Sequence, residues 1–103
     1  MQTIPIKSVP NQVLTVMLAG QLTKIELSTS SDGLMYASIY LNDAAIVTGI
    51  ICQNLNRLIR DAYHGFAGDL AFYDTQGSND PTYDGLGVRY QLTYLTAAEV
   101  AAL

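Results

Sequence analysis

The chain has 103 residues, of which half are apolar and 14% are charged, and its formal net charge is −4. A disordered chain shows the reverse composition, so we expect one folded domain over residues 1–103. The five Lys and Arg residues are scattered and too few to neutralise a nucleic-acid backbone or to hold an anionic membrane, which excludes both partners. Low charge with high apolar content instead favours a subunit of an assembly.

The first part of the sequence predicts a series of short strands. Gln2–Lys7 contains Pro5 and is predicted as a sheet edge or a strand start, because proline cannot donate to a ladder. Gln12–Ala19 is apolar on both faces, which is typical of a strand that is covered on both sides. Leu22–Thr29 and Leu34–Leu41 alternate apolar and polar residues and indicate half-buried antiparallel strands.

Turn-forming residues separate these strands. Asp32-Gly33 and Asn42-Asp43 readily supply the positive φ that hairpin turns require, and Ala45–Cys52 follows as a further strand. The next segment, Cys52–Tyr63, has helical spacing and predicts a short helix or helical turn that ends at Gly65. The apolar residues that carry this spacing are Leu55, Leu58, Ile59 and Ala62.

The last third of the chain predicts two more strands and a helical turn. Leu70–Tyr73 is the first strand, and Val88–Leu95 is the second, with Val88 and every second residue after it pointing inward. Thr96 and Glu99 match a capping box, after which one short turn of helix is expected. Six or seven antiparallel strands in about a hundred residues fit a mainly β fold, either a small sandwich or a partly closed barrel.

The reactive side chains are not arranged for catalysis. Cys52 and His64 could pair as nucleophile and base, but Cys52 ends an apolar run in which a buried, inert cysteine is the usual occupant. A single histidine excludes a zinc site with several histidines. Asp74, Asp80 and Asp84 lack the spacing of a calcium loop, and Asp80-Pro81 and Asp84-Gly85 are better explained as turn formers. We therefore expect no enzyme activity, no metal and no cofactor.

Tyrosine is the residue type that points to contacts, with seven copies and no tryptophan. Its ring and hydroxyl suit protein interfaces, and several tyrosines lie beside turns where a ring is hard to cover. We expect the stretch from Asp74 to Gly87 to hold a fixed shape through Pro81 and to present side chains to a neighbouring subunit, with Arg89 near its base for a carboxylate partner. The predicted interface residues are Tyr63, Phe66, Tyr73, Tyr83, Leu86 and Arg89.

Two segments, MQTIPIKSVPNQVLTVML and GDLAFYDTQGSNDPTYDGLGVRYQLTYLT, carry a resemblance that preserves order over nearly the full length. Together they resemble the baseplate plug family, small tail proteins of contractile-tailed bacteriophages. The middle segment departs from that pattern, because Asn54-Leu55-Asn56 stands where a Pro-Gly turn is expected. The matching positions are Ile4, Pro5, Pro10, Asn11, Gln12, Leu14, Val16 and Leu18 at the front, and Gly68, Asp69, Leu70, Asp74, Asp80, Pro81, Leu86, Gly87, Arg89, Tyr90, Leu92, Tyr94 and Leu95 at the back.

The resemblance implies a virion structural protein at the central hub of a tail baseplate. It would pack against other hub, spike or tail-tube proteins in several copies, close or join the axial channel, and be assembled in the host cytoplasm. The residues alone leave an alternative open, a small carbohydrate- or ligand-binding β domain whose tyrosines stack on sugar rings. A hydrolase that works through Cys52 and His64 is a third and remote class.

Overall fold

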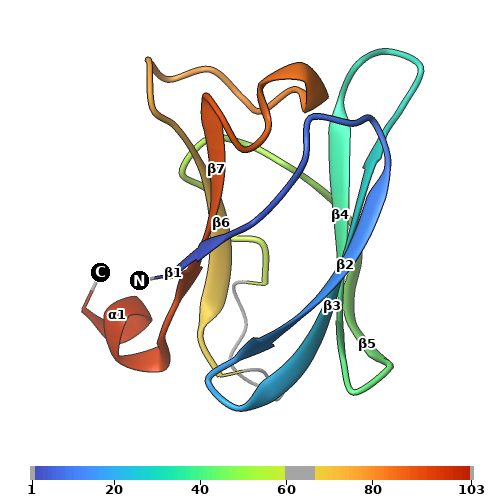
Figure 1. Cartoon of the computed structure of the whole chain (residues 1–103). Helices are drawn as coiled ribbons and strands as arrows, with labels where there is room; N and C mark the ends of the chain where they lie inside the picture. The colour runs from blue at the N-terminus through green and yellow to red at the C-terminus, as the bar shows by residue number, and fades with distance from the viewer. Residues whose placement is uncertain (1, 60–66, 103) are drawn as a thin grey trace.

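The computed structural model describes residues 2–59 and 67–102, and its strands form two antiparallel sheets that face each other (Figure 1). One sheet has the order β1-β7-β6 and the other the order β2-β3-β4-β5. The strands are β1 (Gln2–Ile4), β2 (Gln12–Leu18), β3 (Gln21–Thr29), β4 (Met35–Leu41), β5 (Ala44–Ile51), β6 (Asp69–Asp74) and β7 (Tyr90–Leu95). A 3-10 turn, η2 (Tyr83–Gly85), and a helix, α1 (Ala97–Ala101), complete the described elements. The prediction of a mainly β, antiparallel fold is confirmed, and its form is an open sandwich.

The four-stranded sheet is a meander closed by tight turns. Ala19 and Gly20 have φ values of 51° and 77° between β2 and β3, and Asn42 and Asp43 have 50° and 67° between β4 and β5. Two successive positive φ values define the turn type whose twist matches that of antiparallel strands. The turn at Asn42-Asp43 stands where the sequence predicts it.

The core lies between the two sheets and follows from the alternation along the strands. Ile25 and Ile39 are fully buried from the four-stranded sheet, and Phe72 and Leu92 from the three-stranded sheet. Each such side chain contributes about 1.5 to 3 kcal/mol by leaving water. The inward faces predicted for Leu22–Thr29 and Leu34–Leu41 are confirmed.

The helix predicted for Cys52–Tyr63 is wrong over its described part, residues 52–59. This segment lies instead along the outer side of β6, where Asn54 bridges Phe72 and Arg57 bridges Ala71. The N–H of Leu55 donates to the carbonyl of Phe72 (2.8 Å) and that of Leu58 to Leu70 (2.9 Å). The free edge of β6 therefore satisfies the backbone donors that a helix would have satisfied internally, and tertiary pairing overrides the local pattern. Residues 60–63 lie outside the described part of the chain.

Two further expectations from the sequence differ from the structure. The pattern of Gln12–Ala19 predicts cover on both faces, but Val13 and Met17 are 62% and 56% exposed. The alternation predicts that Val88 points inward, but β7 begins only at Tyr90, and Val88 is 72% exposed. The left-handed conformation of Gly87, with φ +78°, interrupts the alternation just before the strand.

The connection between β1 and β2 is held by two side chains, of which Gln12 is a matching position of the resemblance. The Gln12 side chain accepts a hydrogen bond from the backbone N–H of Lys7 (3.0 Å) and donates one to the backbone carbonyl of Lys7 (2.7 Å). The Ser8 hydroxyl donates to the carbonyl of Leu86 (2.7 Å), which ties this connection to the segment before β7. Sequence-distant parts of the motif therefore meet at one end of the sandwich.

Because it has no side chain, Gly87 lets the segment before β7 pass close to the backbone of Ile6. We predict that Gly87→Ala is strongly destabilising. A Cβ at this position would lie 2.5 Å from the carbonyl oxygen of Ile6, in addition to the strain of φ +78°. We expect a loss of about 3 kcal/mol or more in the free energy of unfolding, measured by urea denaturation. Gly33→Ala is the matched control, because Gly33 has φ +87° with nothing within 4 Å of an added Cβ. It should lose only about 1 kcal/mol, and equal losses in both variants would contradict the steric argument.

Candidate functional site

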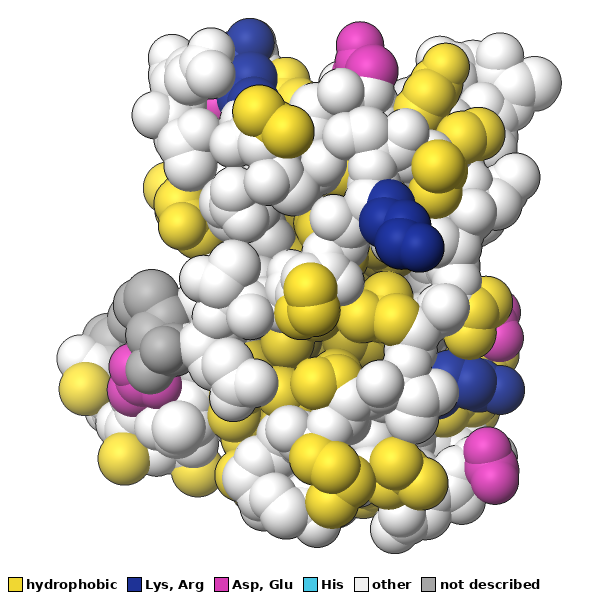
Figure 2. Space-filling view, in the orientation of Figure 1, with side chains coloured by type: hydrophobic (Ala, Val, Ile, Leu, Met, Phe, Trp, Pro, Cys, Tyr) yellow, Lys and Arg dark blue, Asp and Glu magenta, His cyan; other side chains and the backbone are white. Residues whose placement is uncertain are grey.

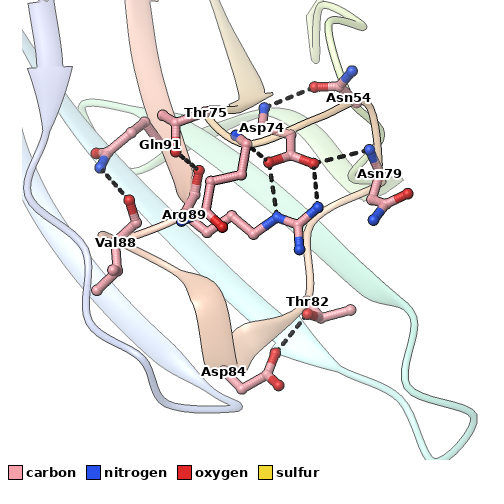
Figure 3. A network of polar contacts seen from close by, with 10 residues as sticks. Asn54, Asp74, Thr75, Asn79, Thr82, Asp84, Val88, Arg89 and Gln91 are labelled. Carbon is pink, nitrogen blue, oxygen red and sulfur yellow. Dashed lines mark hydrogen bonds and ion pairs between the residues drawn. The ribbon is translucent and has the colours of Figure 1, made fainter.

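The connection between β6 and β7, residues 75–89, is closed by an ion pair at its base. Asp74 ends β6, and its side chain is wholly buried, whereas the Arg89 side chain is 31% exposed. The Arg89 Nε and Nη2 groups donate to the two carboxylate oxygens of Asp74, each at 2.8 Å (Figure 3). A bidentate pair fixes both the distance and the orientation of its partners, so it joins the two ends of this 75–89 loop.

The same carboxylate also organises the first part of the loop. The backbone N–H groups of Gln76 and Asn79 donate to Asp74 at 2.8 and 3.0 Å. The Arg89 guanidinium, assisted by these N–H groups and opposed by burial, holds the pKa of Asp74 far below its usual range. Asp74 is therefore ionised at neutral pH and already holds four hydrogen bonds inside the chain.

Asn54 joins the loop to the segment beside β6. Its side-chain oxygen accepts the N–H of Asp74 (2.8 Å) (Figure 3). The backbone N–H of Asn54 donates to the Asp80 carboxylate (3.0 Å). Asp74 and Asp80 therefore hold the backbone of the loop in place, which agrees with the interpretation of Asp80 as a turn former. Among residues 2–59 and 67–102, no cluster of three His, Cys, Asp or Glu side chains is placed to hold a metal ion.

The tip of the loop exposes apolar side chains between two buried anchors. Pro81 and Leu86 are buried on either side of η2, whereas Tyr83 is 40% exposed and Val88 is 72% exposed. Leu86, which the sequence predicts at an interface, packs in the core. Arg89 is predicted to bind a carboxylate of a partner, but it pairs with Asp74 of the same chain. Tyr83 remains available at the surface.

A groove of about 390 Å³ lies on the outward face of the three-stranded sheet. Ala71 and Tyr73 of β6 and Thr93 and Leu95 of β7 line it, because alternate residues of paired strands share one face. The segment beside β6 contributes Leu55 and Arg57 to the same groove. Its lining is predominantly apolar, and its volume lies in the range of sites that accept a small molecule or a few side chains.

Two features of the groove cost free energy in the isolated chain. Thr93 is only 4% exposed, and its buried hydroxyl has no hydrogen-bond partner within the described structure. Such an unpaired group costs about 1 to 3 kcal/mol. Leu55 adopts φ +63° and leaves 72% of its surface exposed, which adds backbone strain to apolar exposure. Unsatisfied and strained residues often gather at functional sites, which makes the groove a candidate contact site.

The other candidate residues fall in three places. Tyr73 lines the groove, whereas Tyr63 and Phe66 lie outside the described residues, as does His64. Cys52 is 3% exposed, and burial raises its pKa to about 12, so its thiol stays protonated at neutral pH. The pairing of Cys52 with His64 as nucleophile and base thus gains no support from the described residues.

Sequence reasoning missed Thr93, Leu55 and Val88. Alternation correctly placed Thr93 on the outward face but could not show that neighbouring side chains cover its hydroxyl. For Leu55, which has helical spacing, the Asn residues on either side are the available sign of a turn. For Val88, the preceding Gly87 is the sign that the strand starts later.

The chain is thus an open antiparallel sandwich with a locked loop and an apolar surface groove. Residues 1–97 match the family model described as cyanophage baseplate Pam3 plug gp18. The chain therefore belongs to this baseplate plug family, a class of structural proteins of the phage tail baseplate, and the resemblance noted in the sequence is confirmed. No curated protein matches the chain. No helix in the described part of the chain is long and apolar enough to cross a membrane.

Asp74→Asn is predicted to destabilise the protein in a pH-dependent way. The folded-state pKa of Asp74 lies below the ordinary carboxyl value, so its ionised form stabilises the fold above about pH 4, and this contribution is lost as pH falls below that value. We expect the variant to melt about 5 °C or more below the unmodified chain at pH 7, with the difference shrinking below about pH 4. Thermal melting monitored by circular dichroism between about pH 7 and about pH 2.5 measures this. Glu26→Gln, which removes the charge of a side chain that is 41% exposed, is the control, and the same pH dependence in both variants would contradict the assignment.

Thr93→Val is predicted to stabilise the isolated chain. Valine keeps the shape of threonine and removes the unpaired hydroxyl, so the free energy of unfolding should rise by about 1 kcal/mol in urea denaturation. Thr23→Val is the matched control, because Thr23 is fully buried but its hydroxyl donates to the carbonyl of Gln21 (3.2 Å). That variant should lose about 1 kcal/mol. A loss of stability in Thr93→Val would show that its hydroxyl has a partner after all.

Proposed function

We propose that this chain packs at the central hub of a phage tail baseplate and closes or joins the axial channel through protein–protein contacts, without catalysing a reaction. The observation that carries the proposal is the 75–89 loop, which the Asp74–Arg89 pair holds in shape while Tyr83 and Val88 stay exposed. A contact surface that is ordered before binding loses little conformational entropy when a partner docks.

The groove extends the proposed contact surface from the loop onto the sheet. Tyr73 lines the groove, and its chain neighbour Asp74 anchors the loop, so the two features are continuous along β6. Tyrosine and exposed aliphatic side chains are groups that contribute strongly to binding energy at interfaces. A partner that fills the groove would cover Leu55 and remove its exposed apolar surface from water.

Charge indicates the character of the proposed partners. Asp80 and Asp84 are exposed on the loop, and Arg89 is neutralised by Asp74, so the loop presents acidic groups around its apolar tip. Neutral or basic surfaces of neighbouring hub, spike or tail-tube proteins are complementary to it. We propose several copies in each particle and assembly in the host cytoplasm, where a protein whose single cysteine is buried and reduced needs no oxidation to fold.

The groove does not favour the alternative of sugar binding. A sugar ring needs several converging hydrogen-bond partners around its hydroxyls, whereas the lining here is predominantly apolar. Protein side chains suit such a lining better.

The double variant Tyr83→Ser with Val88→Ser tests the proposed function. Both side chains are exposed, so we expect the variant to fold and melt within a few degrees of the unmodified chain, yet to enter assembled baseplates about tenfold less or worse. The measurement is the amount of the chain in purified particles relative to other tail proteins. Leu34→Ser, at a similarly exposed apolar residue (44%) beside the turn between β3 and β4, is the control and should enter normally. Normal incorporation of the double variant would rule out the loop as a contact.

A further inference from the structure

β2 is a sheet edge that nothing in the described structure covers. It stands at the end of the four-stranded sheet and pairs on one side only, with β3. Its seven residues, QVLTVML, include no charged residue and no proline. Soluble proteins usually protect an edge of this length with a lysine, a proline or a bulge, because its free N–H and C=O groups invite another strand.

The other three sheet edges are protected. β1 has three residues and is followed at once by Pro5. The outer side of β6 is bridged by Asn54 and Arg57. β5 shifts register twice against β4 and contains Gly49 at φ +63°. β2 is therefore the exception among the edges that the structure describes.

The hydrogen-bond pattern of β2 directs the backbone groups of three residues toward the open edge. The pair Leu18–Gln21 closes a two-residue turn, which makes it a hydrogen-bonded pair. Hydrogen-bonded and non-hydrogen-bonded pairs alternate along an antiparallel ladder. The N–H and C=O groups of Val13, Thr15 and Met17 consequently point away from β3, and the side chains of the same residues are exposed.

Both faces of β2 have apolar surface left to cover. On the outer face, Met17 lies opposite Leu22 of β3, which is itself 45% exposed. On the inner face, Leu14 and Val16 are only partly buried against the core. Figure 2 shows apolar side chains reaching the surface in the middle of the molecule, with a Lys or Arg side chain close beside them. A strand added at this edge would place cross-strand neighbours beside these side chains on both faces and so remove part of their apolar surface from water.

We propose that the strand that pairs with β2 is β2 of a second copy of the chain, antiparallel and centred on Thr15. In this register Thr15 faces its own counterpart, Val13 faces Met17, and Leu14 faces Val16. Over residues 13–17 each cross-strand pair is then apolar or a threonine pair, both of which stabilise a sheet, and no like charges meet along the strand. The two four-stranded sheets become one continuous sheet across a two-fold axis.

The nearest charges do not oppose this pairing. Lys24 lies opposite Thr15 in β3, and in the paired sheet it would be three strand spacings, about 14 Å, from its copy. That distance exceeds the screening length of about 8 Å at physiological salt. Its ammonium group already lies over the ring of Tyr40 (4.7 Å) and near Glu26 (4.0 Å). The pairing concerns the free chain and does not depend on the proposed baseplate function.

Charge exchange at Thr15 tests the proposal on the purified full chain. The unmodified protein should sediment at twice the chain mass in analytical ultracentrifugation. Thr15→Lys and Thr15→Glu should each raise the dimer dissociation constant about tenfold or more, because like charges then face each other at the axis. An equimolar mixture of the two variants should form the dimer again, since opposite charges meet.

Two controls distinguish pairing through β2 from a general effect of added charge. Thr48→Lys places the same charge on β5, at the opposite edge of the sheet, and should leave the dimer unchanged. Within one chain, Val13→Lys with Met17→Glu should keep the dimer, whereas Val13→Lys with Met17→Lys should dissociate it. A monomeric unmodified chain, a dimer indifferent to both Thr15 variants, or a mixture that stays monomeric would each overturn the proposal. Circular dichroism verifies that every variant is folded.

Discussion

The carboxylate of Asp74 is the group that holds the base of the 75–89 loop together. It is buried, ionised and held by Arg89 from the far end of the connection over residues 75–89. A buried charge without its partner is strongly destabilising, so carboxylate and guanidinium hold each other in place. The N–H groups of Gln76 and Asn79 complete its coordination, and the loop therefore has little freedom to rearrange.

Asp69 plays a parallel part at the other end of β6. Its carboxylate is buried and accepts the N–H groups of Ile59 (2.9 Å) and Leu70 (2.7 Å). One strand thus carries a buried acid at each end, and each acid fastens a neighbouring irregular segment to the sheet. Asp69, Asp74 and the preceding Gly68 all belong to the resemblance, and an added Cβ on Gly68 would clash with the carbonyl oxygen of Leu95. The family pattern in this part of the chain therefore includes residues that hold the architecture.

Sequence reasoning succeeded where one residue in two faces a core. The alternation in Leu22–Thr29 and Leu34–Leu41 is decisive because one face of those strands is fully covered, and the capping box at Thr96 and Glu99 is a local hydrogen-bond pattern that sequence alone specifies. Sequence reasoning failed where contacts between residues far apart in the chain determine the local structure. Leu58 and Ile59 are buried as an amphipathic helix would bury them, but the free edge of β6 draws their segment into extended pairing. Leu86 stands among turn formers, as a surface residue would, because its burial depends on the return of the chain across the end of the sandwich.

The burial of Cys52 gives the protein a built-in probe of its own opening. Its N–H donates to the carbonyl of Met35 (2.9 Å), and its thiol is enclosed at the end of β5 in the core of the sandwich. A thiol-specific reagent can reach this sulfur only after the two sheets separate locally. Because the chain contains one cysteine, the rate at which Cys52 is modified in the native protein reports how often the sandwich opens locally. No engineered label is needed.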